Sequence, residues 1–202
     1  MGTHSTTPTR EEINPKSTAR QQATVILRRL APAWNQNASL AIQEQAEGLP
    51  EFKSARAVAC YLAQPREVQT RAIAQACWNG GRRLAVPAYD KSLSRYGLAW
   101  LNENDSTHDG IFGIAEPVSP VWAKPTDIDL LVVPCLAFDI YGRRLGHGGG
   151  HFDRLLGGHC GLKICLAFEA QRLVAVPAEP HDIPVDLIIT EKNIYDARAN
   201  RK

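Results

Sequence analysis

The stretch from Asp139 to Arg154 reads DIYGRRLGHGGGHFDR and packs five glycines, three arginines and two histidines into sixteen residues. It follows an apolar run, 129–134, that has the character of a buried strand. Glycines allow positive φ and let backbone N–H groups approach a ligand closely. Arginines supply forked donors that match phosphate and carboxylate oxygens. A strand, such a loop and a following helix together predict a site for a phosphate-bearing or polyanionic ligand.

The loop does not match the common nucleotide-binding patterns. It lacks the Gly-Lys-Ser/Thr of a Walker A loop, and no acidic residue follows it at the distance expected of a dinucleotide fingerprint. A glycine turn that merely joins strand to helix is the structural alternative. The arginines at 143, 144 and 154 favour the anion site, because an idle turn has little use for three flanking guanidinium groups.

Apolar spacing predicts a single α/β domain. A strand, a helix, Gly80-Gly81 and a second strand follow one another over 56–86, which is typical of a βαβ unit with a parallel strand pair. Pro87 is expected to end the second strand. The predicted helices are 15–30, 36–47, 67–78 and 149–156, and the predicted strands are 56–62, 82–86, 97–101, 128–133, 162–168 and 185–190.

Length and composition fit one globular domain over 15–202, preceded by a polar tail over 1–14 that is expected to be disordered. The net charge of +2 and the absence of basic runs argue against nucleic acid as a partner. Neither a membrane-spanning stretch nor a secretory signal is visible. The five cysteines, none in CxxC spacing, are expected to be buried reduced thiols. These features predict a cytoplasmic protein, most simply a monomer, without a membrane partner.

Residues 129–154 closely resemble the signature of the 5-formyltetrahydrofolate cyclo-ligase (5,10-methenyltetrahydrofolate synthetase) family. That pattern runs approximately Asp-apolar-Pro-x-x-Ala-Phe-Asp-x-x-Gly-x-Arg-Leu-Gly-x-Gly-Gly-Gly-Tyr-Tyr-Asp-Arg. The resemblance extends over about 15–194. Its further matches are Lys16 with Arg20, Glu67 to Thr70, Phe112 to Ile114 with Glu116-Pro117, Ala167 to Glu169 with Gln171, Pro177, His181-Asp182, Asp186 and Thr190-Glu191.

The resemblance implies both a fold and a reaction. The fold is an open, mainly parallel α/β sheet flanked by helices, similar to ribose-5-phosphate isomerase and the CoA-transferases. The reaction converts 5-formyltetrahydrofolate and ATP to 5,10-methenyltetrahydrofolate, ADP and phosphate, with Mg²⁺ as cofactor. The formyl oxygen attacks the γ-phosphorus, N10 then attacks the activated carbon, and phosphate leaves.

The resemblance also assigns the ATP site, and its residue types suit phosphoryl transfer, which depends on positioning and charge neutralisation. Lys16 and Arg20 lie one helical turn apart and can face one anion, although a solvated helix face is the structural alternative. Arg143 or Arg144 is expected to bind the γ-phosphoryl group as charge develops. The predicted ATP site comprises Lys16, Arg20, Arg143, Arg144, Leu145, Gly146, His147, Gly148, Gly149, Gly150, His151 and Phe152, with Arg144 and His151 as catalytic residues.

The folate and metal sites follow in the same way. The predicted folate site comprises Glu67, Gln69, His147, Gly148, Gly149, Gly150 and His151. Glu67 is expected at the start of a helix, where its carboxylate can accept from pterin N–H groups. Asp153 and Asp182 match the family's Mg²⁺ ligands, and two hard oxygen ligands with phosphates and waters make an ordinary Mg²⁺ shell. Helix-dipole stabilisation is the structural alternative for Asp153, and a structural histidine is the alternative for His147.

Three residues depart from the family pattern. His151-Phe152 stands where the family commonly has Tyr-Tyr, and Gln69 stands where it usually has an acid. A histidine here is expected to make activity more sensitive to pH. These departures leave open a paralogue that binds a nucleotide or a folate-like ligand with altered or no catalysis. A sugar-phosphate isomerase or CoA-transferase of the same fold is a third possibility, distinguished by turnover without ATP.

Overall fold

The computed structural model describes residues 14–201 of the chain. The predicted N-terminal tail over 1–14 therefore lies outside the described residues, apart from Asn14. The Asn14 side chain accepts the N–H of Lys16 at 2.9 Å and so caps the first helix. The helices are α1 Pro15–Arg29, α2 Pro32–Gly48, α3 Pro50–Ser54, α4 Arg71–Asn79, α5 His151–Gly157 and α6 Ala197–Asn200, with short 3₁₀ turns at Ile111–Gly113, Pro125–Asp127 and Glu169–Gln171.

Within 14–201 the main sheet has eight strands in the order β12-β11-β10-β7-β1-β2-β3-β6. The five inner strands, from β11 to β2, are parallel, and the strands at both edges are antiparallel. Small two-stranded ladders join β4 to β5 and β8 to β9. The strands are β1 Ala57–Cys60, β2 Arg83–Asp90, β3 Arg95–Trp100, β4 Thr107–Asp109, β5 Ala115–Pro117, β6 Val121–Ala123, β7 Leu130–Pro134, β8 Ala137–Phe138, β9 Arg144–Leu145, β10 Leu162–Leu166, β11 Leu187–Ile189 and β12 Ile194–Asp196.

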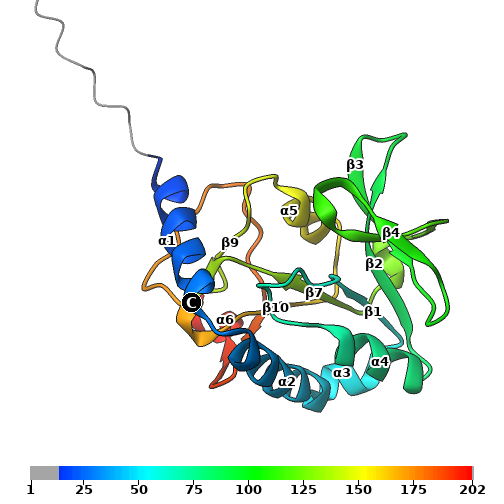
Figure 1. The fold of residues 1–202 in the computed structure, drawn as a ribbon, viewed down its shortest axis with the longest axis horizontal. Coiled ribbons are helices and arrows are strands. Elements are labelled where there is room, and N and C mark those ends of the chain that lie inside the picture. Colours follow the sequence, from blue (N-terminus) through cyan, green and yellow to red (C-terminus); the bar gives the residue numbers. More distant parts are fainter. Residues whose placement is uncertain (1–13, 202) are drawn as a thin grey trace, which may run out of the picture.

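Helices cover both faces of the sheet, as Figure 1 shows, with α2, α3 and α4 on one side and α5 on the other. Strand β7 is buried on both faces, because Leu130 and Val132 pack into one core and Leu131 and Val133 into the other. The mainly parallel open sheet confirms the predicted fold class. No helix in the described part of the chain has both the length and the apolar character to cross a bilayer.

Three predicted boundaries are wrong by four residues. Helix α2 begins at Pro32 and not at 36, because a proline suits the first turn of a helix. Residues 67–70 form a loop and not the first turn of a helix, because Tyr61 Oη donates to the Val68 carbonyl at 2.7 Å and Thr70 Oγ1 donates to the Tyr61 carbonyl at 2.7 Å. Strand β2 does not end at Pro87 but continues to Asp90. Beyond Ala85 it pairs only with β3, and a proline is tolerated where one side of a strand has no neighbour.

The cysteines follow the prediction with one exception. All five are free thiols and four of them are buried, but Cys160 is exposed. It lies in the turn between α5 and β10, just before the buried strand begins.

His159, next to this turn, is 4% exposed, and its burial lowers the pKa of the imidazole below the ordinary 6.5. A histidine with a lowered folded-state pKa supports the native state at neutral pH. That support is lost as the pH falls, because the unfolded chain takes up the proton first. We expect His159→Phe to weaken the fall in the free energy of unfolding between pH 7 and pH 5, measured by urea titration. His108→Phe, at an exposed position, is the control, and an unchanged pH dependence in His159→Phe would contradict the expectation.

Candidate active site

A cavity of about 540 Å³ opens at the carboxyl ends of β1 and β7, the edge at which open α/β sheets bind ligands. Its walls come from segments far apart in the chain: the first turns of α1, the loop 61–67, Tyr96 and Ile114, the glycine loop 146–150 with the start of α5, and the loop 179–182. A second hollow of about 690 Å³, lined among others by Trp78 and Trp100, contains none of the predicted site residues.

The glycine loop needs glycine at two of its positions. Gly148 has φ of 106° and Gly150 has φ of 64°, a backbone region that residues with a Cβ rarely adopt. A Cβ on Gly148 would also lie 3.4 Å from the Arg20 guanidinium carbon. The Arg20 Nε donates to the Gly146 carbonyl at 2.9 Å, which ties α1 to the loop.

Arg144 and Asp153 form the most buried ion pair of this site. Both terminal nitrogens of Arg144, whose side chain is 3% exposed, donate to the same Asp153 oxygen at 2.9 and 3.0 Å. That oxygen also accepts the N–H of Ile183 at 3.2 Å. Because Ile183 follows Asp182 directly, the two carboxylates predicted to bind metal lie on adjoining segments, and the second Asp153 oxygen is left for another partner.

Arg143 is placed elsewhere. Its Nε donates to Asp139 at 2.6 Å, and it does not line the cavity. Arg143 stands in the turn just before β9, where Asp139 holds its side chain, whereas Arg144 is the first residue of the strand.

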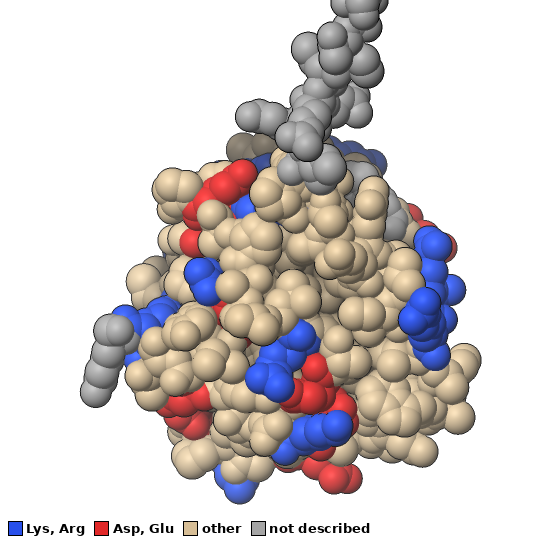
Figure 2. All heavy atoms as spheres, turned by 90° about the vertical axis from the view of Figure 1, so that its left-hand side faces the viewer, with Lys and Arg blue, Asp and Glu red and all other residues tan. Residues whose placement is uncertain are grey.

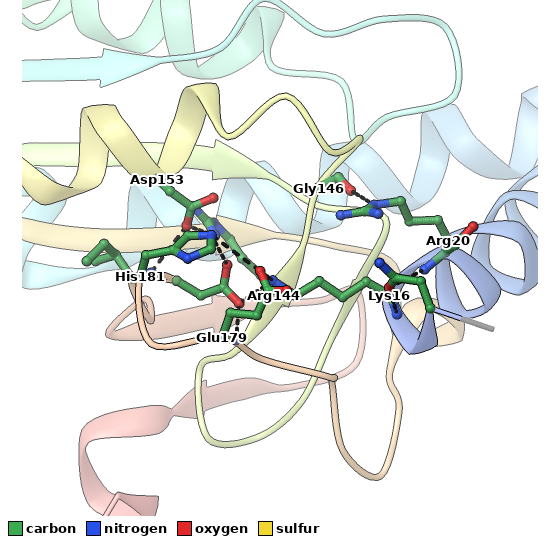
Figure 3. A network of polar contacts seen from close by, with 11 residues as sticks. Lys16, Arg20, Arg144, Gly146, Asp153, Glu179 and His181 are labelled. Atoms are coloured by element: carbon green, nitrogen blue, oxygen red, sulfur yellow. Dashed lines mark hydrogen bonds and ion pairs between the residues drawn. The ribbon is translucent and has the colours of Figure 1, made fainter. Parts of the chain in front are cut away.

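Lys16 extends from α1 toward the loop 179–182, as Figure 3 shows. Its Nζ lies 2.8 Å from a Glu179 oxygen and 2.6 Å from an Asp182 oxygen. The exposed imidazole of His181 stands beside both carboxylates, at 3.4 and 3.8 Å. The single ammonium group therefore offsets one of the two negative charges of this loop.

Glu67 forms the opposite side of the cavity. Burial raises the pKa of its carboxyl group to about 6, against the opposing effect of the hydrogen bond that Gln64 N donates at 2.8 Å. His147 Nε2 stands 4.0 Å away. Gln69 does not line the cavity: its amide donates to the carbonyls of Gln64 and Glu67, so it supports the loop from behind.

His151 meets Tyr96 edge to face, with ring centroids 4.9 Å apart. Burial, and then the charge of Arg154, lower the pKa of His151, so the imidazole is neutral at neutral pH. Phe152 also lines the cavity and packs against both apolar cores. An aromatic wall therefore remains where the family pattern has two tyrosines.

The sequence alone suggested no role for three residues that line the cavity: Glu179, His181 and Tyr96. The only local signal for the first two was the run Glu-Pro-His-Asp that ends at Asp182. Their ligand atoms and that of Asp182 lie within 4.8 Å of one another. Carboxylate oxygens are the donors that Mg²⁺ prefers, so Asp182, Glu179 and the second oxygen of Asp153 fit such an ion.

On the face that carries α1, whose first turns line the cavity, basic and acidic side chains lie interspersed (Figure 2). The site itself combines two arginines and a lysine with four carboxylates, three of which (Asp153, Glu179 and Asp182) lie on the side of the cavity that faces Lys16. This arrangement can hold a polyphosphate through its cations and a divalent ion through its carboxylates.

The sequence matches the profile of the 5-formyltetrahydrofolate cyclo-ligase family over residues 12–191. The 5-formyltetrahydrofolate cyclo-ligase of Escherichia coli K12 is 29% identical over 154 residues, which cover 73% of this chain and 84% of that one. The enzyme of the same name from Haemophilus influenzae is 29% identical over 160 residues, covering 75% and 85%.

Solved structures agree. The NMR structure of Aquifex aeolicus 5,10-methenyltetrahydrofolate synthetase superimposes with a TM-score of 0.82 and 32% identity, over 92% of this chain and 94% of that one. The synthetase from Mycoplasma pneumoniae, at 20% identity, shares the fold with a TM-score of 0.70, over 88% of this chain and 99% of that one.

The raised pKa of Glu67 predicts a pH-dependent stability effect. A carboxyl group whose pKa rises from 4.5 to about 6 on folding destabilises the native state once it ionises. Glu67→Gln keeps an oxygen for the Gln64 N–H and removes the charge. We expect the variant to exceed the parent by about 2 kcal/mol in free energy of unfolding above pH 7, with the gain shrinking toward pH 4.5. Urea titrations across this pH range measure the free energy of unfolding. Glu103→Gln, at an exposed position, is the control. A gain in stability that does not depend on pH would contradict the expectation.

Proposed function

The chain belongs to the 5-formyltetrahydrofolate cyclo-ligase family, and from this premise we propose that it converts 5-formyltetrahydrofolate and ATP to 5,10-methenyltetrahydrofolate, ADP and phosphate, with Mg²⁺. The observation that carries the proposal is the convergence of Lys16, Arg20, Arg144 and three carboxylates on one cavity beside the glycine loop. A phosphoryl-transfer site needs these charges.

The ATP phosphates are proposed to lie along the loop from Arg144 to Phe152. Backbone N–H groups of the glycines approach them, while Lys16 and Arg20 face them from α1. Arg144 is held by Asp153 with its guanidinium plane fixed, which suits a donor that must meet charge developing on the γ-phosphoryl group without rearranging. Arg143 is not included in this set, because its side chain is engaged by Asp139 outside the cavity.

Asp153 and Asp182, with Glu179 beside them, are the residues that would hold Mg²⁺. When bound, the ion would neutralise phosphate charge. In the ligand-free protein the Lys16 ammonium group pairs with Glu179 and Asp182. When these carboxylates bind Mg²⁺ instead, the ammonium group becomes available to bind phosphate.

The folate is proposed to lie between Glu67 and the aromatic wall of His151 and Tyr96. Glu67 is positioned to accept from pterin N–H groups, and His147 stands on the same side of the cavity. The formyl oxygen then attacks the γ-phosphorus and ADP leaves. N10 attacks the activated carbon, N10 loses its proton, and the C–O bond to phosphate breaks as the ring closes.

The first experiment follows the absorbance of the methenyl product with purified protein, 5-formyltetrahydrofolate, Mg²⁺ and ATP. We expect growth of that band with ATP and none in a control without ATP. No growth from folded protein that binds ATP would contradict the proposed function and support the catalytically altered paralogue. Conversion without ATP would place the protein in a different enzyme class.

Lys16→Gln tests the proposed phosphate site. Loss of a charge-assisted hydrogen bond to phosphate should raise the KM for MgATP about 10- to 100-fold. The affinity of Glu179 and Asp182 for Mn²⁺ alone should rise, because the competing ammonium group is gone; electron paramagnetic resonance of free Mn²⁺ measures this. Lys53→Gln, an exposed lysine on α3, makes the same charge change away from the cavity. Equal KM values for the two variants would remove Lys16 from the site.

A further inference from the structure

Asp139 is a fully buried carboxylate that the proposed reaction does not use. It opens the glycine- and arginine-rich stretch, at the end of β8. Its Oδ1 accepts the N–H groups of Tyr141 at 3.0 Å and Arg143 at 3.2 Å, which closes the turn between β8 and β9. Its Oδ2 accepts Arg143 Nε at 2.6 Å and the N–H of Val176 at 2.9 Å. Oδ1 therefore serves the turn alone, whereas Oδ2 binds both the Arg143 side chain and the distant segment at Val176.

The hydrogen bond from the Val176 N–H joins the β8–β9 hairpin to the loop 176–183. This loop carries the acidic cluster, which consists of Glu179 and Asp182. At the far end of this loop, Ile183 donates its N–H to Asp153. Two carboxylates, Asp139 and Asp153, thus hold the two ends of the loop, and both belong to the same hairpin-to-helix stretch as Arg144. Between these ends the loop reaches Lys16 through its acidic side chains.

We propose that Asp139 is a positioning residue that sets the loop 176–183 against Arg144, so that the acidic cluster and the arginine face the same phosphates. Arg143 then acts as the counter-ion of Asp139 and not as a ligand of ATP. A buried carboxylate needs such a partner, since an unpaired buried charge is strongly destabilising. The consequence for phosphate binding rests on the proposed function, whereas the role of Asp139 in positioning the loop does not.

Asp139→Asn cuts one of the two connections selectively. The asparagine oxygen is expected to keep the Oδ1 place, where two backbone N–H groups need an acceptor and an Asx turn suits the residue. Its NH₂ group then faces Arg143 Nε and the Val176 N–H, which are both donors. The turn survives, and the loop loses its hydrogen bond at Val176 while it keeps the one from Ile183 to Asp153.

The test has a readout that needs neither metal nor nucleotide. In ligand-free protein, amide hydrogen exchange over 177–183 should become about tenfold faster in Asp139→Asn, while exchange over 137–145 stays close to the parent. In the assay, the KM for MgATP should rise about 10- to 100-fold, as is typical when an outer-shell partner of a metal site is lost. The KM for 5-formyltetrahydrofolate should change less than twofold. Asp196→Asn, at the end of β12, changes a carboxylate whose ion pair with Arg198 is exposed and lies away from the loop, and it is the control.

A second variant guards against loss of folding. Asp139→Asn combined with Arg143→Gln removes the unpaired guanidinium but leaves the Val176 N–H without its acceptor, so exchange in the loop should stay fast. Unchanged exchange over 177–183 in both folded variants would overturn the proposal. Equal acceleration in hairpin and loop would overturn it as well, since Asp139 would then be a general structural residue. If no turnover is seen even in the parent protein, the exchange data still decide the role of Asp139.

Discussion

The ion pair between Arg144 and Asp153 is the interaction on which the rest of the site depends. It joins β9 to α5 across the glycine loop. The same Asp153 oxygen also accepts the N–H of Ile183, at the end of the loop 176–183. The arginine side chain is almost fully buried, so removing Asp153 would leave a poorly solvated charge, at a cost of about 3–5 kcal/mol. The glycine loop is therefore fixed at both of its ends, and its backbone amides can be preorganised for an anion.

A second feature of the site is that its cations already have partners before any ligand binds. The cations that suit ATP are already partnered: Lys16 with carboxylates, Arg20 with a backbone carbonyl and Arg144 with Asp153. A site of this kind stays nearly neutral before its ligand arrives. On the proposed function, Mg²⁺ and the phosphates of ATP would each replace an existing partner, so few charges would be desolvated without compensation.

The departures from the family pattern have different physical weight. Gln69 lies behind the cavity and supports the loop of Glu67, where an amide suffices. His151 keeps an aromatic ring against Tyr96, and its lowered pKa keeps it uncharged near neutrality. Neither residue removes a charge from the proposed phosphate site. The site thus favours the cyclo-ligase over a paralogue without catalysis.

The sequence by itself determined the parallel core, the glycine loop and the family, because apolar periodicity, glycine spacing and motif order are local properties. It also identified most of the residues that line the cavity, since they belong to those motifs. Tertiary structure alone decided that Arg144 faces the cavity while Arg143 pairs with Asp139, and that Glu67 stands in a loop. Only the fold brings Lys16 to Glu179 and Asp182, more than 160 residues away. Such pairings depend on strand order and side-chain direction, which no local pattern encodes.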